Sequence, residues 1–369
     1  MKAGQWGTLG ELHAAVIDED MRKHDYMLDT RQMRVTAHGQ LVVDELNTYF
    51  DFTDNAHQQT AELTKIPMVY YRRMAEEAPD LLAHNINEWF ERKPARRMLR
   101  TLDHSNTPSP EGLKDITRGH ARALLSDSYR RIDNPFIMEA LFPVLHDVDG
   151  LEIKSLDLTP NKMYIKIVNP KIEGEIRKGD VVQTGVLISN SEIGRGAVVV
   201  KPLIYRLICS NGMIAADRDA GNGIRKNHVG RVNDYIDADF TVLSSETAIA
   251  NEKALALTIA DVTRNTLSQE TFDRVTGKMR DAAEVQITST DIPRVVELMS
   301  KDYGMSIAEK TVVQDALIRD NDFTKYGLAN AITRASKEVD SYDRASELEA
   351  YGWNVMNTPM RQWREWNKA

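Results

Sequence analysis

The stretch from residue 181 to residue 214, VVQTGVLISNSEIGRGAVVVKPLIYRLICSNGMI, constrains the fold more than any other part of the chain. Its two long apolar runs are rich in β-branched residues, which favour strands. Gly194-Arg195-Gly196 separates the runs and predicts a reversal of the chain. A dinucleotide-binding loop would need a third glycine where Val199 stands, and a helix after it. The stretch therefore predicts a β-hairpin at the centre of a sheet.

Residues 151–169 alternate around a Thr-Pro-Asn-Lys turn and extend this sheet before the pattern becomes helical near residue 240. Residues 31–45 alternate around His38-Gly39 and predict a separate β-hairpin. We expect an α+β fold in which a central, curved, mostly antiparallel β-sheet has flanking helices and is followed by a helical C-terminal part. The expected division is an N-terminal β-hairpin region (1–60), an α+β core with the central antiparallel sheet (61–240) and a helical C-terminal domain (241–369).

Helical periodicity is clearest in two places. Residues 67–92 predict two helices, with Leu82, Ile86 and Trp89 forming one buried stripe. A longer apolar stripe predicts a single helix over residues 324–351, stopped by Gly352. These helices supply apolar faces that must be covered by the sheet or by one another.

The composition excludes several classes of protein. No run approaches the roughly 18 consecutive apolar residues of a membrane span, and the first residues lack the apolar block of a signal peptide. A single cysteine, Cys209, cannot form an intrachain disulfide or a cysteine-based metal site, which is typical of the cytoplasm. The phosphate-binding sequence of P-loop ATPases does not occur.

Basic residues gather in two segments of a chain whose net charge is −8. Residues 91–131 contain ten basic and five acidic residues, and residues 195–231 contain seven basic and two acidic. Local clusters of Lys and Arg favour phosphate binding whatever the overall charge. The alternative, which has equal weight, is that folding spreads these basic residues over separate solvent-exposed surfaces that bind no phosphate. Part of the first cluster, residues 92–100, also suits the negative end of the preceding helix.

The leading hypothesis is binding of single-stranded nucleic acid, in which Arg and Lys contact phosphates and Tyr or His stacks on bases. On a regular strand Lys201 and Tyr205 face away from Arg206, which argues against one continuous patch. The predicted nucleic-acid-binding residues are Arg118, Arg122, Tyr129, Arg130, Arg131, Arg195, Lys201, Tyr205, Arg206, Arg225, Lys226, His228 and Arg231.

Two other functions stay open. Asp217 and Asp219 would hold Mg²⁺ in a metal-dependent phosphodiesterase or nuclease. Without that metal, no catalytic residue or cofactor is predicted, because a lone Cys209 is more often a small core residue than a nucleophile. The other function is that of a non-enzymatic protein that assembles with itself or binds a host protein, which the strong helical pattern of residues 324–351 favours.

Six blocks of sequence, taken together and in order, resemble the phage/plasmid-like protein family, a domain of unknown function of phage and plasmid genomes. The blocks are residues 66–89, 121–134, 187–197, 205–213, 224–230 and 326–352. The resemblance implies a mobile-element protein in the cytoplasm of a bacterial host cell, and no established activity. At the level of fold, the predicted architecture is also similar to phage single-strand annealing proteins, which implies recombination and a homo-oligomer.

Overall fold

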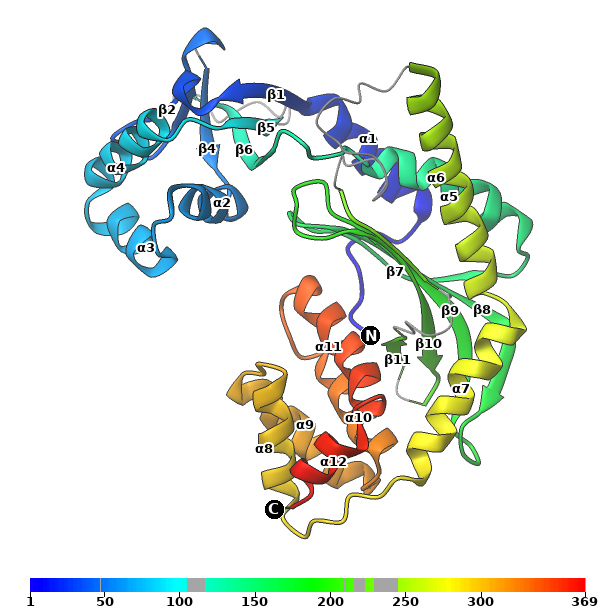
Figure 1. The fold of residues 1–369 in the computed structure, drawn as a ribbon. Helices are drawn as coiled ribbons and strands as arrows, with labels where there is room; N and C mark the ends of the chain where they lie inside the picture. Colours follow the sequence, from blue (N-terminus) through cyan, green and yellow to red (C-terminus); the bar gives the residue numbers. More distant parts are fainter. Residues whose placement is uncertain (47, 105–116, 209, 216–222, 229–244, 369) are drawn as a thin grey trace.

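The computed structural model describes residues 1–46, 48–104, 117–208, 210–215, 223–228 and 245–368. Two β-sheets and the helices around them make up the molecule (Figure 1). The predicted α+β class is confirmed, with a curled, mostly antiparallel sheet followed by a helical C-terminal part. None of the helices in the described ranges is long and apolar enough to cross a membrane.

The first sheet, here called the N-terminal sheet, has the order β1-β5-β6-β4-β3-β2. Neighbouring strands are antiparallel except β4 and β6, which run parallel. The predicted hairpin is confirmed, since Met33 pairs with Val43 and Val35 with Leu41. Its strands are β1 (Lys23–Asp29), β2 (Met33–Val35), β3 (Leu41–Val43), β4 (Thr48–Phe52), β5 (Arg96–Asp103) and β6 (Thr117–Ser126), with short 3-10 turns at Thr30–Gln32 and Asp44–Leu46.

Three helices cover this sheet, and residues 23–131 together are called the N-terminal lobe below. They are α2 (Asp54–Thr64), α3 (Met68–Glu77) and α4 (Pro79–Arg92). Leu82, Ile86 and Phe90 of α4 are buried against Phe50 and Leu99 of the sheet. The prediction that Trp89 completes the buried stripe is wrong, because Trp89 is 36% exposed. Phe90, one position further on, fills the core instead.

The second sheet, here called the central sheet, is built on residues 181–214. Its order is β11-β10-β9-β8-β7, with β12 also paired to β10, and all pairs are antiparallel. The hairpin of β9 and β10 is therefore confirmed and central. The strands are β7 (Glu152–Leu158), β8 (Met163–Glu175), β9 (Val181–Asn190), β10 (Val198–Arg206), β11 (Asn211–Ile214) and β12 (Ile224–Lys226).

Helices lie on both sides of the central sheet (Figure 1). Apolar residues of α1 (Leu9–Arg22), α5 (Asn134–Asp147) and α6 (Ser245–Thr266) share one core with β8, β9 and β10. A second core joins the sheet to α7 (Gln269–Glu284), α10 (Lys325–Ala335) and α11 (Tyr342–Met356). Ser268 caps the start of α7, since its side chain accepts from the backbone N–H of Thr271.

The last helices form a core of their own with α10 and α11. They are α8 (Ile292–Asp302), α9 (Ile307–Asp320) and α12 (Met360–Trp366). A capping box of Ser306 and Glu309 begins α9. Trp363 and Trp366 are buried in this core, so the C-terminal segment docks on the body of its own chain.

The predicted single helix over residues 324–351 is wrong. The segment forms α10 and α11, and Ser341 caps the second helix by accepting from the N–H of Arg344. Gly352 does not stop a helix but lies inside α11. A Cβ at Gly352 would lie 2.5 Å from Cγ2 of Thr333 in α10. The glycine is therefore required by the close approach of two helices.

Candidate functional site

The connection between β9 and β10, residues 191–197, is the point at which the central sheet meets the N-terminal lobe. Gly194 has a φ of +79°, which favours glycine. A Cβ at this position would also lie 2.7 Å from Cδ2 of Leu125 and 3.3 Å from Nε2 of Gln59. The connection is therefore pressed against β6 and α2 of the N-terminal lobe.

Amide side chains of α2 fasten this contact. Asn55 Nδ2 donates to the carbonyl oxygens of Arg122 (2.9 Å) and Ile193 (3.1 Å). Gln59 Nε2 donates to the Ile193 carbonyl at 3.0 Å, while its Oε1 accepts from the N–H of Leu124 at 2.8 Å. One helix thus holds a strand of its own sheet and a turn of the other sheet in fixed positions.

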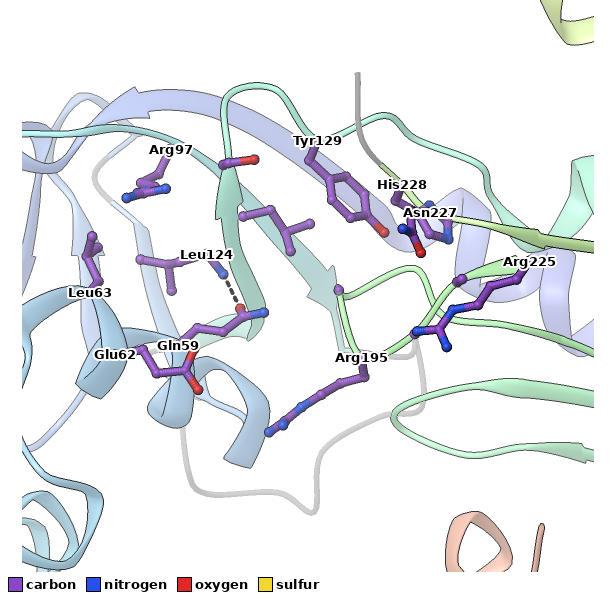
Figure 2. A pocket seen from close by; sticks show the side chains of 15 residues that line it. Gln59, Glu62, Leu63, Arg97, Leu124, Tyr129, Arg195, Arg225, Asn227 and His228 are labelled. Atoms are coloured by element: carbon purple, nitrogen blue, oxygen red, sulfur yellow. Dashed lines mark hydrogen bonds between the residues drawn. The ribbon is translucent and has the colours of Figure 1, made fainter. Parts of the chain in front are cut away.

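A cavity of about 690 Å³ lies at this junction (Figure 2). Residues of the N-terminal lobe and residues of the central sheet both line the cavity, so its shape depends on how the two sheets meet. The lining residues are Gln59, Glu62, Leu63, Arg97, Leu124, Leu125, Ser126, Tyr129, Gly194, Arg195, Gly196, Ala197, Arg225, Asn227 and His228.

Three arginines from three elements line this cavity. Arg97 comes from β5, Arg195 from the β9–β10 connection and Arg225 from β12. Arg195 donates to Oε1 of Gln58 at 2.6 Å, which orients its guanidinium without neutralising the charge. The Nε of Arg97 is buried without a hydrogen bond, and the structure gives Arg97 and Arg225 no ion pair with another described residue. Glu62 is the single carboxylate among the lining residues. The cavity is therefore suited to an anion.

A pair of stacked rings forms one wall of the cavity. Tyr129 and His228 lie parallel, with centroids 5.1 Å apart and an interplanar angle of 3°. The Tyr129 hydroxyl donates to the Ser191 carbonyl at 3.2 Å. Burial raises the pKa of Tyr129 and lowers the pKa of His228, so both rings are held in their neutral forms near pH 7. Both residues line the cavity together with the three arginines.

Other predicted site residues are used to hold the molecule together. Arg122 is buried 3.3 Å from Glu19 and 3.7 Å from Glu192. Arg131 lies 3.5 Å from Asp25. Arg206 makes two hydrogen bonds to Asp180, at 2.6 and 2.9 Å. The charges of Arg122 and Arg206 are therefore largely satisfied by carboxylates of the same chain. Arg131 is 61% exposed, and its carboxylate partner Asp25 already pairs with Arg100 at 2.8 Å.

The remaining predicted residues are dispersed or outside the described ranges. Tyr205 is covered by the ammonium of Lys154, 4.8 Å from its ring centre. Lys201 is half-buried on β10, while Lys226 is exposed on β12 and Arg130 is half-buried after β6. Arg231, Asp217, Asp219 and Cys209 lie outside the described residues, as does the side chain of Arg118. Within the described ranges no group of three or more His, Cys, Asp or Glu side chains could hold a metal ion.

The structure brings together Tyr129, Arg195, Arg225 and His228 and adds three residues that the sequence reasoning missed. Gln59, Arg97 and Asn227 line the same cavity. Arg97 stands in the basic cluster that was attributed to the end of a helix, but α4 ends at Arg92 and β5 begins at Arg96. The alternation of a strand separates Arg97 from Arg96 and Arg100, and this was the signal that could have singled it out.

The fold and the cavity define an α+β protein with a positively charged site between two mostly antiparallel sheets. Residues 121–348 match the family described as Domain of unknown function (DUF932), and the chain belongs to that family. The match includes Tyr129, Arg195, Arg225 and His228, whereas Arg97 and α2 precede it. Searches of curated proteins and of solved structures found no match.

Proposed function

We propose that this protein binds single-stranded nucleic acid and that the cavity between the two sheets holds a nucleotide of the strand. The observation that carries the proposal is that Arg97, Arg195 and Arg225 line the same cavity as the stacked rings of Tyr129 and His228 (Figure 2). Guanidinium groups bind phosphate oxygens in pairs, and aromatic faces bind unpaired bases. A base stacked in duplex does not offer its face, so the arrangement favours single strands.

The size and composition of the cavity agree with this ligand. A volume of about 690 Å³ is in the range of small-molecule sites and accommodates one nucleotide unit. Leu63, Leu124 and Leu125 supply an apolar part next to the charged part, as a base joined to a phosphate requires. The wider setting that we propose is DNA metabolism of a phage or plasmid in a bacterial host, including single-strand annealing by a homo-oligomer.

The test is fluorescence anisotropy of a labelled single-stranded oligonucleotide with the full chain. We expect binding at low salt that weakens steeply as salt is added, with a logarithmic slope of about −0.7 for each phosphate contacted. The double variant Arg195→Ala, Arg225→Ala removes two phosphate ligands and should weaken binding about 100-fold, at roughly 1.4 kcal/mol for each arginine.

Arg264→Ala is the matched control. Arg264 is a partly exposed arginine of α6 that pairs with Asp147 and Asp261, and its removal changes the net charge without touching the cavity. The control variant should bind like the unchanged protein. Absence of binding at low salt, or equal losses in the double variant and the control after allowing for charge, would exclude the proposed function.

A further inference from the structure

A second hollow lies on the N-terminal lobe, between the α2–α3 connection and α4. Its volume is about 300 Å³, and it shares only Leu63 with the arginine-lined cavity. Ile66, Tyr70, Trp89 and Phe90 give it apolar and aromatic walls. We call it the Trp89 groove. It lies before residue 121, where the family match begins.

Aromatic side chains are unusually accessible around this groove. Trp89 is 36% exposed and Tyr70 is 47% exposed, although both belong to helices with well-buried opposite faces. Val69 and Leu81 of the same two helices are 86% and 47% exposed. Half-exposed Trp and Tyr next to a pocket are characteristic anchors of protein interfaces, because they bury much area with little loss of side-chain freedom.

The rim of the groove is positively charged. Lys65 and Lys93 are the charged residues among its lining, and no carboxylate lines it. The Lys93 ammonium lies 5.1 Å from the centre of the Trp89 ring, which places a cation beside the aromatic anchor. Nearby acids have other partners, because Glu62 accepts from Gln58 and Glu88 pairs with Arg92. The two lysines make no ion pair with a described residue.

We propose that the Trp89 groove docks an acidic peptide segment of a partner protein, which inserts one aromatic or large aliphatic side chain between Tyr70 and Trp89. The volume suits one such side chain, and carboxylates on either side of it would pair with Lys65 and Lys93. A peptide fits better than a nucleic-acid strand because Leu63, Ile66, Pro67 and Phe90 make the floor apolar. The proposal does not depend on the proposed function.

The experiment selects a random heptapeptide phage library on the immobilised full chain, with the Trp89→Ser, Lys93→Glu variant as the counter-selection. We expect enriched peptides that combine an aromatic or large aliphatic residue with several acids. Labelled copies should bind more weakly by about tenfold to the Lys65→Glu, Lys93→Glu variant, because both rim charges are reversed. Lys253→Glu, at an exposed lysine of α6, is the matched control and should bind normally.

Each other outcome overturns the proposal. The groove is not such a site if no peptide is recovered or if the recovered peptides lack acidic residues. The same conclusion follows if the peptides bind the Lys65→Glu, Lys93→Glu variant as tightly as they bind the unchanged protein. Light scattering separates a second copy of the chain from a foreign partner. If the protein is a dimer and the Trp89→Ser variant is a monomer, the groove serves self-association. If the enriched peptides displace a bound oligonucleotide, the groove binds nucleic acid. The melting temperature of every variant is compared with that of the unchanged protein to confirm folding.

Discussion

His228 shows how one residue can differ from its predicted role. It was predicted as a nucleic-acid contact, and it does line the cavity, but its side chain is 6% exposed and serves the fold as well. Nε2 lies 3.0 Å from Oδ1 of Asn190, and Nδ1 lies 3.2 Å from the Arg130 carbonyl. The Asn190 amide nitrogen is already donating to Ile132 and Asn134. Both ring nitrogens therefore face oxygen acceptors.

The burial of His228 predicts a pH dependence of stability. Burial lowers the pKa of His228 below its ordinary value, although the hydrogen bond to the Arg130 carbonyl and the charge of Asp133 act against this shift and Arg100 acts with it. The unfolded chain therefore takes up a proton first as the pH falls through about 6.5, and stability declines towards the folded pKa. We expect the loss of unfolding free energy between pH 7 and pH 5 to be smaller in His228→Gln by about 1 kcal/mol.

The measurement is urea unfolding at several pH values. Burial also lowers the pKa of His57, so His57→Gln is the matched comparison and should change the profile independently of His228. Additive effects of the two substitutions would agree with two separate titrating groups. A His228→Gln profile parallel to that of the unchanged protein would contradict the assignment.

At the scale of elements, the β9–β10 connection has two reasons to contain Gly194. One is its positive φ, and the other is that a Cβ at this position would lie too close to Leu125 and Gln59. Gly179 has a nearly identical φ of +81°, but a Cβ there would meet nothing within 4 Å. A comparison of substitutions at the two glycines therefore separates the cost of the backbone conformation from the cost of contacts with neighbouring side chains.

We expect Gly179→Ala to cost about 1 kcal/mol of unfolding free energy, which is the ordinary cost of a left-handed conformation. Gly194→Ala should cost about 1–3 kcal/mol more, because Leu125 must move as well. Urea titration of both variants gives the difference. Equal costs would show that the contact of the connection with the N-terminal lobe is loose. If the cavity binds nucleic acid, Gly194→Ala should also weaken that binding by displacing Arg195.

The strands and caps were predictable because their signals are local. The hairpins of β2–β3, β7–β8 and β9–β10 follow from alternation around turn residues. Ser268 and Ser306 begin helices, and serine is a residue type that favours this position. Gly352 misled the prediction because a glycine required by a neighbouring helix looks like one that ends a helix.

Only part of the site could be predicted from the sequence. An arginine is available to a ligand only if no carboxylate of the same chain pairs with it, and such carboxylates lie far away in the sequence. Arg206 meets Asp180, and Arg122 meets Glu19. The division of the chain into independent domains stays a prediction.

At the scale of the whole molecule, a buried ion-pair network joins the N-terminal lobe to the central sheet. Its centre is Glu192, whose side chain is 4% exposed and lies 3.4 Å from Lys23, 3.8 Å from Arg100 and 3.7 Å from Arg122. Glu192 also accepts from the N–H of Asn134 at 2.8 Å. Although burial opposes its charge, the carboxylates of Asp25, Asp133 and Glu192 raise the pKa of Arg100. The network fixes the junction at which the cavity lies.

Glu192→Gln should be among the most destabilising isosteric changes in the protein. It leaves three cations near a neutral amide, and breaking a buried pair in this way costs about 3–5 kcal/mol. Urea unfolding measures the loss, and amide hydrogen exchange should show faster opening of β1 and of the β9–β10 connection. Glu297→Gln, which removes an exposed pair with Arg294, should change neither quantity. Similar stability of the two variants would mean that the network does not hold the junction.

The ion pair of Lys23 with Asp133, 3.1 Å long, lies where the chain departs from the central core and where it comes back to it. Residues 23–131 are therefore topologically an insertion between α1 and α5. Leu12 and Val16 of α1 are buried against residues of α5 and β7, which follow that insertion in the chain. During synthesis on the ribosome, Leu12 and Val16 lack these apolar neighbours until the residues that follow the insertion have been made. The core of the central sheet therefore closes around a helix that was made before the insertion.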